Sequence, residues 1–277
     1  MLKEFIKKLR WFGKGAPSPV TQPKSKGETW SVLDIVSVIF RTMKLLLNVA
    51  FVFIFFGVVL GAGLGLGYAA SLFSDVSVPN QEELVSQVNK ISGISKLTYA
   101  NGELISEIDN DLLRIPVASD AISDNVKNAI IATEDENFET HNGVVPKAVL
   151  RATLGSVVGL GSSSGGSTLT QQLIKQQVVG DAPTFKRKAV EIVDALALER
   201  YMSKDDILTT YLNVAPFGRN NKGQNIAGVE EAAQGIFGVS AKDLTIPQAA
   251  FIAGLPQSPI VYSPYASDGS MKSPDDM

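Results

Sequence analysis

The feature that most constrains this chain is an uncharged apolar run from Leu45 to Ala70. Its 26 residues would make a helix about 39 Å long, whereas the hydrocarbon core of a bilayer is about 30 Å thick. Asn48 is the most polar side chain in the run. A cleavable signal peptide would be shorter and would begin closer to the N-terminus. The run therefore predicts a transmembrane helix over residues 45–70.

The charges on the two sides of this run are unequal. Residues 1–44 carry nine Lys or Arg and three acids, a net charge of +6. Because the whole chain carries −3, the remainder must carry −9. Lys and Arg gather on the cytoplasmic side of a membrane helix. We therefore expect a single-pass plasma-membrane protein, with a cytoplasmic basic tail (1–44) and an extracellular C-terminal part.

Two features near the run have more than one explanation. Gly57, Gly61 and Gly65 recur every four residues, a spacing that lets helices pack closely, as in a homodimer. A glycine-rich span without a partner would have the same pattern. The apolar stretch Trp30–Phe40 either lies at the inner interface as an amphipathic helix or extends the span.

Composition excludes several classes of protein. The chain has no cysteine and one histidine, which excludes a disulfide scaffold, a cysteine nucleophile and a thiolate or multi-histidine metal site. A net charge of −3 argues against a nucleic-acid partner.

The sequence after the run changes from a connector to a helical domain. Residues 71–118 contain one strand candidate, Lys96–Tyr99, and a turn at Asn101-Gly102. From Ala121 on, apolar spacing and hydroxyl caps predict helices. The first predicted helix begins near Ala121. The others cover residues 148–158, 167–178, 184–202, 203–212, 226–237 and 246–255. Strand signals are weak, so the predicted fold class is mainly α.

The first candidate site is the segment EDENFETHNG, which begins at Glu134. Two adjacent acids after an apolar helix face are usually a solvated helix end, and a lone histidine such as His141 is usually structural. The alternative is that Phe138 desolvates Glu134 and suits it to general acid or base chemistry.

Two further motifs combine polar side chains with cations. In GGSTLTQQLIKQ (165–176), Ser167, Gln171 and Lys175 share one helical face, which suits either an anion site or a capped surface helix. In RKAVE, Arg187 and Lys188 are spaced to pair with Glu191. Surface ion pairing alone would explain that spacing, but a carboxylate beside two cations also suits a phosphorylated leaving group.

Taken in order, the motifs resemble one family. EDENFETHNG, Arg151-Ala152, GGSTLTQQLIKQ, RKAVE and KDDILTTYLNVAPFG resemble the glycosyltransferase 51 domain of class A penicillin-binding proteins, with the general look of a streptococcal member. The expected organisation is a basic tail (1–44), a transmembrane helix (45–70), a connector (71–118), a lysozyme-like glycosyltransferase domain (119–265) and the start of a linker to an absent transpeptidase domain (266–277).

The resemblance implies polymerisation of lipid II into peptidoglycan, with inversion at the anomeric carbon and release of polyprenyl pyrophosphate. By matching position, Glu134 is the general base and Glu191 assists departure of the pyrophosphate, directly or through Mg²⁺ or Mn²⁺. The same matching assigns substrate binding to six further residues, namely Arg151, Ser167, Gln171, Lys175, Arg187 and Lys188. No cofactor is implied as obligatory. The implied partners are lipid II, the growing glycan strand, the membrane and other proteins of cell-wall synthesis and division.

The sequence departs from the family pattern in small ways within the domain, with Gln176 in place of the usual Asn and Leu169 in place of a common Ile. The family normally continues into a transpeptidase domain with a Ser-x-x-Lys nucleophile, and no lysine here has serine three positions before it. We therefore do not predict β-lactam binding by this chain. A lysozyme-like lytic muramidase and a non-catalytic membrane-anchored scaffold are the alternatives.

Overall fold

The computed structural model describes residues 31–91, 95–101, 103–108, 112–149, 151 and 166–273, with strands 95–98 and 104–108 described by backbone alone. The chain divides into two compact units, Met1–Gly67 and Tyr68–Met277. The two units are described separately below. The predicted limits of tail, span, connector and outer domain stay predictions.

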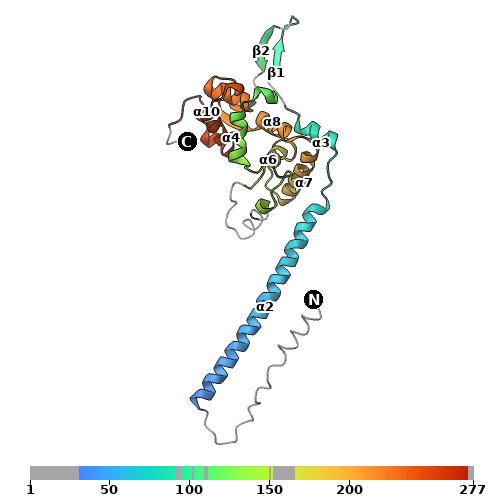
Figure 1. Cartoon of the computed structure of the whole chain (residues 1–277), viewed down its shortest axis with the longest axis vertical. Helices are drawn as coiled ribbons and strands as arrows, with labels where there is room; N and C mark the ends of the chain where they lie inside the picture. Colours follow the sequence, from blue (N-terminus) through green and yellow to red (C-terminus); the bar gives the residue numbers. More distant parts are fainter. Residues whose placement is uncertain are drawn as a thin grey trace. The chain divides into compact units, whose positions relative to one another are not determined.

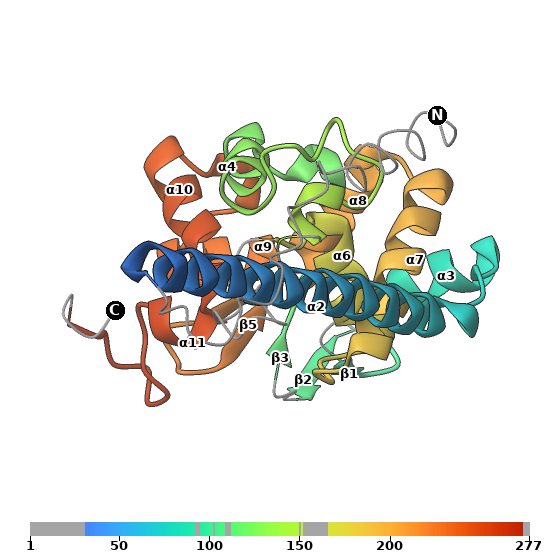
Figure 2. The ribbon, with the colours of Figure 1, turned by 90° about the horizontal axis from the view of Figure 1, so that it is seen from below.

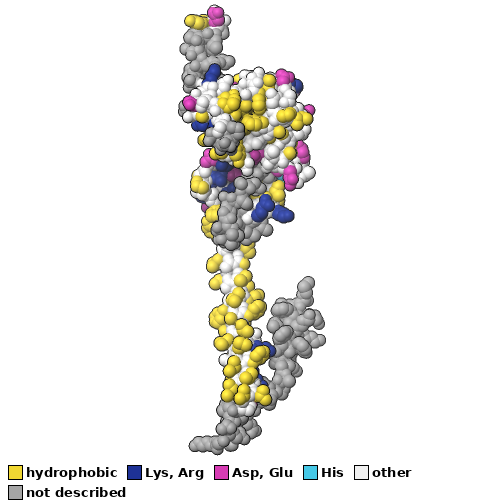
Figure 3. Space-filling view, turned by 90° about the vertical axis from the view of Figure 1, so that its left-hand side faces the viewer, with side chains coloured by type: hydrophobic (Ala, Val, Ile, Leu, Met, Phe, Trp, Pro, Cys, Tyr) yellow, Lys and Arg dark blue, Asp and Glu magenta, His cyan; other side chains and the backbone are white. Residues whose placement is uncertain are grey.

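The first unit consists, in its described part, of the long helix α2 (Val32–Ser74), which continues past the end of that unit. Ser31 and Asp34 cap its start, because each backbone N–H is bonded by the other residue's side chain at 3.2 Å. Hydrophobic side chains cover the helix and none is buried (Figure 3). By length and composition α2 can cross a membrane. Residues 32–40 belong to this same helix, as the extension alternative predicted.

The second unit is mainly helical, as predicted (Figure 1). Its longer helices are α3 (Gln81–Val88), α4 (Asp124–Glu134), α6 (Leu169–Ile174), α7 (Phe185–Tyr201), α8 (Lys204–Val214) and α10 (Ile246–Gly254). Shorter turns are α9 (Val229–Ala232), α11 (Pro259–Tyr262), the π-turns η2 (Lys175–Val179) and η3 (Ala233–Phe237), and the 3₁₀ turns η1 (Ser119–Ala121), η4 (Ala241–Asp243) and η5 (Leu255–Gln257).

One hydrophobic core holds this unit together. The helix α6 packs against both α7 and α8, and α10 packs along α4 (Figure 2). The largest fully buried side chains come from α4, α6, α7, α8 and the segments between and after them, and include Ile130, Phe138, Leu173, Leu198, Tyr211, Leu212, Phe217 and Ile226. At about 1.5–3 kcal/mol for each buried large apolar side chain, this core fixes how the helices lie against one another.

Local capping explains where the helices begin. Thr184 caps α7 by accepting the Arg187 N–H at 3.1 Å, and Ser203 caps α8 by accepting the Asp206 N–H at 3.1 Å. Both starts agree with the sequence prediction. The helix predicted over 167–178 instead begins after Thr168, which forms a capping box with Gln171, and it widens into the π-turn η2 at Lys175. The helix predicted over 148–158 lies mostly outside the described residues.

The strands are short and were largely missed by the sequence prediction. The predicted strand is β1 (Ser95–Thr98), which pairs with β2 (Leu104–Ile108) in an antiparallel ladder; Gly102 of the predicted turn lies outside the described residues. A second sheet has the order β3 (Leu112–Leu113), β5 (Asn225–Ala227), β4 (Pro216–Arg219).

The helix predicted over 226–237 is wrong at its start, because Ile226 lies in β5. Gly228 follows the strand with φ +84°, and a Cβ there would stand 2.9 Å from the Asn213 carbonyl oxygen. Only a glycine fits that close approach, and its left-handed backbone breaks the helical pattern. Helix α9 therefore begins at Val229.

Candidate functional site

The first carboxylate of the candidate site, Glu134, is the last residue of α4 and is half-buried. Its Oε2 accepts a hydrogen bond from Nε2 of Gln172 on α6, at 2.8 Å. The Oε1 of the same amide accepts from the hydroxyl of Tyr211 on α8, at 3.1 Å. Glu134 is therefore held by a neutral donor, so its charge is not neutralised by the contact.

The neighbouring acid, Asp135, has a different environment. It is buried, and its Oδ2 lies 2.7 Å from Nε2 of His141 and 2.9 Å from the Leu169 backbone N–H. The Gly143 N–H donates to the other ring nitrogen, Nδ1, at 3.0 Å. A nitrogen that accepts carries no proton, so Nε2 is the donor to Asp135.

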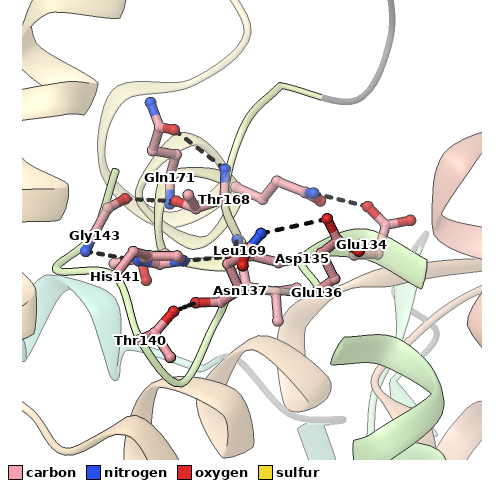
Figure 4. Close-up of polar contacts among 12 residues, drawn as sticks. Glu134, Asp135, Glu136, Asn137, Thr140, His141, Gly143, Thr168, Leu169 and Gln171 are labelled. Carbon is pink, nitrogen blue, oxygen red and sulfur yellow. Dashed lines mark hydrogen bonds and ion pairs between the residues drawn. The ribbon is translucent and has the colours of Figure 1, made fainter. Parts of the chain in front are cut away.

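These contacts of Asp135 and His141, called the clasp below, tie the segment after α4 to the start of α6. Figure 4 shows His141 between Asp135 and Gly143, whose carbonyl accepts from the Thr168 hydroxyl at 2.6 Å. Both side chains of the Asp135–His141 pair are consumed by contacts within the chain. The arrangement fits the structural explanation for His141 and leaves Glu134 outside these contacts, held by the Gln172 amide.

A second layer of charge lies behind the clasp. The Nζ of Lys204 donates to the His141 carbonyl at 2.8 Å, pairs with Glu199 and stands 4.4 Å from the centroid of the Phe138 ring. Thr170 donates to the same Glu199 carboxylate at 2.6 Å. These contacts hold the loop that follows Glu134 against α6, α7 and α8.

The second carboxylate, Glu191 on α7, is only 1% exposed. Its Oε2 lies 2.5 Å from Nη1 of Arg187, and its Oε1 contacts Nζ of Lys188. Gln171 donates to Oε1 as well, at 3.3 Å. Lys188 also donates to the Ser167 hydroxyl at 2.9 Å. The predicted helical spacing is thus present, but it makes a buried cluster and not a surface ion pair.

Lys175 and Arg151 are the remaining predicted site residues. Lys175 is paired with the exposed Asp181, at 2.8 Å between Nζ and Oδ1. The hydrogen bond and charge of Lys175 lower the pKa of the Asp181 carboxyl. Arg151 is exposed and borders residues that are not described.

The two carboxylates are linked through α6. Gln171 and Gln172 are adjacent residues of this helix, and their amides donate to Glu191 and Glu134 respectively. Successive residues on a helix point about 100° apart, so one short helix can reach two different walls of a site. The capping box at Thr168 and the close packing of α6 on α7 and α8 fix that orientation.

Several residues of this region were missed by the sequence reasoning. Gln172 contacts Glu134, Asp181 contacts Lys175, and Tyr211 contacts Gln172. Of these, only Gln172 had a sequence signal, because it lies beside Gln171 in the same motif. Asp194, one turn after Glu191, is buried, and burial raises the pKa of its carboxyl to about 6.

A divalent cation does not fit at Glu191 in this arrangement, because both carboxylate oxygens already face cations. Within the described ranges no group of three His, Cys, Asp or Glu side chains could hold a metal ion. No step below depends on Mg²⁺ or Mn²⁺, and the predicted assistance by either ion is untested.

Comparison with known proteins gives one family match. A family model described as Transglycosylase matches residues 101–276. Penicillin-binding protein 1F of Bacillus subtilis (strain 168) is 34% identical over 199 residues, which is 72% of this chain and 26% of that protein.

Two other relatives are named penicillin-binding protein 1A. The one from Clostridium botulinum (strain Langeland) is 37% identical over 235 residues, covering 83% of this chain and 27% of that protein. The one from Streptococcus oralis is 35% identical over 224 residues, covering 79% and 33%. The chain thus spans about a quarter to a third of the length of these relatives.

Proposed function

The chain belongs to the transglycosylase family, and from that premise we propose that it is a peptidoglycan glycosyltransferase that polymerises lipid II into glycan strands. The membership confirms the resemblance predicted from the order of the motifs. The observation that carries the proposal is the arrangement on α6. There, neighbouring amides donate to Glu134, which is held by a neutral donor, and to Glu191, which is paired with two cations.

Glu134 is assigned the role of general base. It takes the proton from the 4-hydroxyl of the acceptor sugar while that oxygen attacks the anomeric carbon of the donor. The new C–O bond forms as the bond to pyrophosphate breaks, which inverts the anomeric centre. A base needs an unneutralised carboxylate that can be reached, and Glu134 is half-buried with an uncharged donor on one oxygen.

Glu191 is assigned a different role, as the counter-charge that holds cations in place. The leaving pyrophosphate is already anionic, so fixed cations can stabilise it without a proton donor. Arg187 and Lys188 are held by Glu191 but remain partly exposed, at 16% and 32% of their side chains. Lys175, Ser167, Gln171 and Arg151 are assigned to the same substrate-binding region by family matching.

The membrane anchor fits a lipid-carried substrate. We infer that α2 spans the plasma membrane, with the basic tail inside and the catalytic unit outside, because Lys and Arg are concentrated before the helix. The other expected partners are the growing strand and further proteins of cell-wall synthesis and division. A homodimer through the glycine-spaced face of α2 is a further expectation, and no nucleic-acid partner is expected.

The two alternatives make different demands on the site. A lytic muramidase needs an acid that protonates its leaving group, and has no use for the cations around Glu191. A non-catalytic scaffold has no use for Gln172 directed at a half-buried carboxylate. The polymerase uses both features.

The test uses fluorescent lipid II in detergent, with glycan products separated on a gel. The variants are Glu134→Gln and, as a matched control, Glu136→Gln, which changes an exposed glutamate of the same motif. Long glycans are expected from the parent and from Glu136→Gln, and none from Glu134→Gln. Small soluble muropeptides would instead indicate a muramidase. No product from a parent with native helical circular dichroism would contradict the proposal for this chain.

A further inference from the structure

Behind Glu134 lies a short line of hydrogen bonds that no motif assignment uses. The Tyr211 hydroxyl lies 3.1 Å from Oε1 of Gln172, whose Nε2 lies 2.8 Å from Oε2 of Glu134. The three residues come from α8, α6 and α4, and are far apart in the sequence. The line therefore connects the fully buried Tyr211 to the half-buried carboxylate of Glu134.

The direction of donation along this line is determined by chemistry. An ionised carboxylate can only accept, so the amide end that faces Glu134 must be the NH₂ group. The other end is then a carbonyl oxygen, which requires a donor. Tyr211 has no exposed surface, and its burial, with the charge of Glu134 as a second cause, raises the pKa of its hydroxyl. The phenol therefore keeps its proton and can donate to Gln172.

The same line also excludes the reversed amide. A flipped Gln172 would point its carbonyl oxygen at the Glu134 carboxylate, and the two acceptors would repel each other. Tyr211 could then only accept from the NH₂ group, which leaves Glu134 without a donor. Two partners with fixed roles at the two ends allow the amide one orientation.

We propose that Tyr211 is a positioning residue for glycosyl transfer, acting through Gln172 to hold the Glu134 carboxylate in place. This rests on the proposed function, in which Glu134 is the base. Tyr211 has no exposed surface, so it acts on the reaction through Gln172 and not by contact with substrate. Its effect must therefore appear in the rate of the chemical step, whereas substrate affinity should be unchanged.

The test is a double-mutant cycle measured as initial rates of lipid II polymerisation by the full chain. Tyr211→Phe keeps the buried ring and removes the hydroxyl, and Gln172→Met keeps the length of the side chain and removes its polar atoms. Loss of one hydrogen bond predicts a fall in kcat of about three- to tenfold for Tyr211→Phe, with KM within about twofold. In the Gln172→Met background the same tyrosine change should produce no further loss.

The matched control is Tyr201→Phe, which removes a half-buried tyrosine hydroxyl bonded to the Pro79 carbonyl, at 3.2 Å, at the far end of α7. It should leave kcat unchanged. A structural role of Tyr211 would give the same fall in both Gln172 backgrounds, and that result would overturn the proposal. So would a change in KM with constant kcat, or an unchanged kcat in Gln172→Met alone, which tests the line even if Tyr211→Phe does not fold.

These outcomes are separable from failure of the proposed function. If Glu134→Gln retains full activity, the assignment of the base fails. If Glu134→Gln is inactive and the cycle is additive, only the positioning role fails.

Discussion

The two ends of the site use the same residue type in opposite ways. Glu134 ends a helix, is half-buried and is held by one neutral amide, whereas Glu191 lies inside a helix, is 1% exposed and meets two cations. Burial of a charge without a partner is costly, so the deeper carboxylate needs its cations. The comparison teaches that the half-buried Glu134, held by a neutral donor, suits the proposed base, while Glu191 is a fixed part of the framework.

The largest expected effect separates chemistry from folding at the Glu134 end. Glu134→Gln should lower kcat by about 10²–10⁴-fold, the usual contribution of a general base. Its melting temperature should match that of the parent, because a glutamine oxygen can still accept from Gln172. Rates and thermal unfolding by circular dichroism measure the two quantities. A large loss of stability would contradict the contrast drawn between the ends.

The next effect is expected at the Glu191 end, where chemistry and stability should fall together. Glu191→Gln leaves Arg187 and Lys188 beside a neutral amide. Removing one partner of a fully buried ion pair costs about 3–5 kcal/mol. Because Arg187 and Lys188 are partly exposed, we expect a smaller loss of stability, about 1–3 kcal/mol. Activity should fall about 10²-fold. The control is Asp205→Asn, which changes a carboxylate that is 61% exposed and pairs with Lys127, and which should change stability less. Equal melting temperatures for Glu191→Gln and the parent would contradict the framework role.

Asp194 sharpens the comparison, because it is a buried acid on α7 that meets no cation among the described residues. Burial raises the pKa of its carboxyl from 3.8 to about 6. Between about pH 4 and 6 the folded state therefore keeps a proton that the unfolded state has released, so stability is lost as pH rises through this window. Asp194→Asn removes this slope and should raise stability at pH 7 by roughly 1–3 kcal/mol.

Thermal unfolding of this variant at several pH values measures the effect. Asp120→Asn changes an exposed acid and serves as the control, with the slope of the parent expected. If the parent and Asp194→Asn show the same change in stability between pH 4 and pH 7, burial does not control the protonation of Asp194.

The smallest expected effect concerns the exposed counterpart of Glu191. Asp181 is 89% exposed and pairs with Lys175, so solvent screens the interaction. Asp181→Asn should free Lys175 for an anionic substrate and lower KM by less than about fivefold, with stability unchanged. Lipid II titrations at low and high salt measure the change, which should shrink at high salt. A higher KM would mean that Asp181 assists binding.

Much of the fold followed from local patterns in the sequence. Thr184 and Ser203 cap their helices as predicted, because capping depends on residues three positions apart. The ion-pair spacing of Arg187, Lys188 and Glu191 also followed from one turn of helix. The strand at Ile226 did not, since its helical pattern was overridden by the close approach of Gly228 to the Asn213 carbonyl.

The site divides in the same way. Matching of motifs pointed to Glu134 and Glu191, but not to Gln172 or Tyr211, which lie 38 and 77 positions from Glu134 in the sequence. Only packing of α4, α6 and α8 brings these groups within hydrogen-bond distance. Lys175 was grouped with Arg187 and Lys188 by family matching, and the structure pairs its Nζ with Asp181, a contact that no motif predicted.

By itself, the sequence determined the features that depend on neighbours along the chain: the apolar segment long enough for a bilayer, the helix starts and the order of the motifs. The tertiary structure alone decided which acid is neutralised, which amide faces which carboxylate, and that burial raises the pKa of the Asp194 carboxyl to about 6. The physical reason is desolvation, since the cost of a charge depends on everything packed around it, and those neighbours come from helices distant in the sequence.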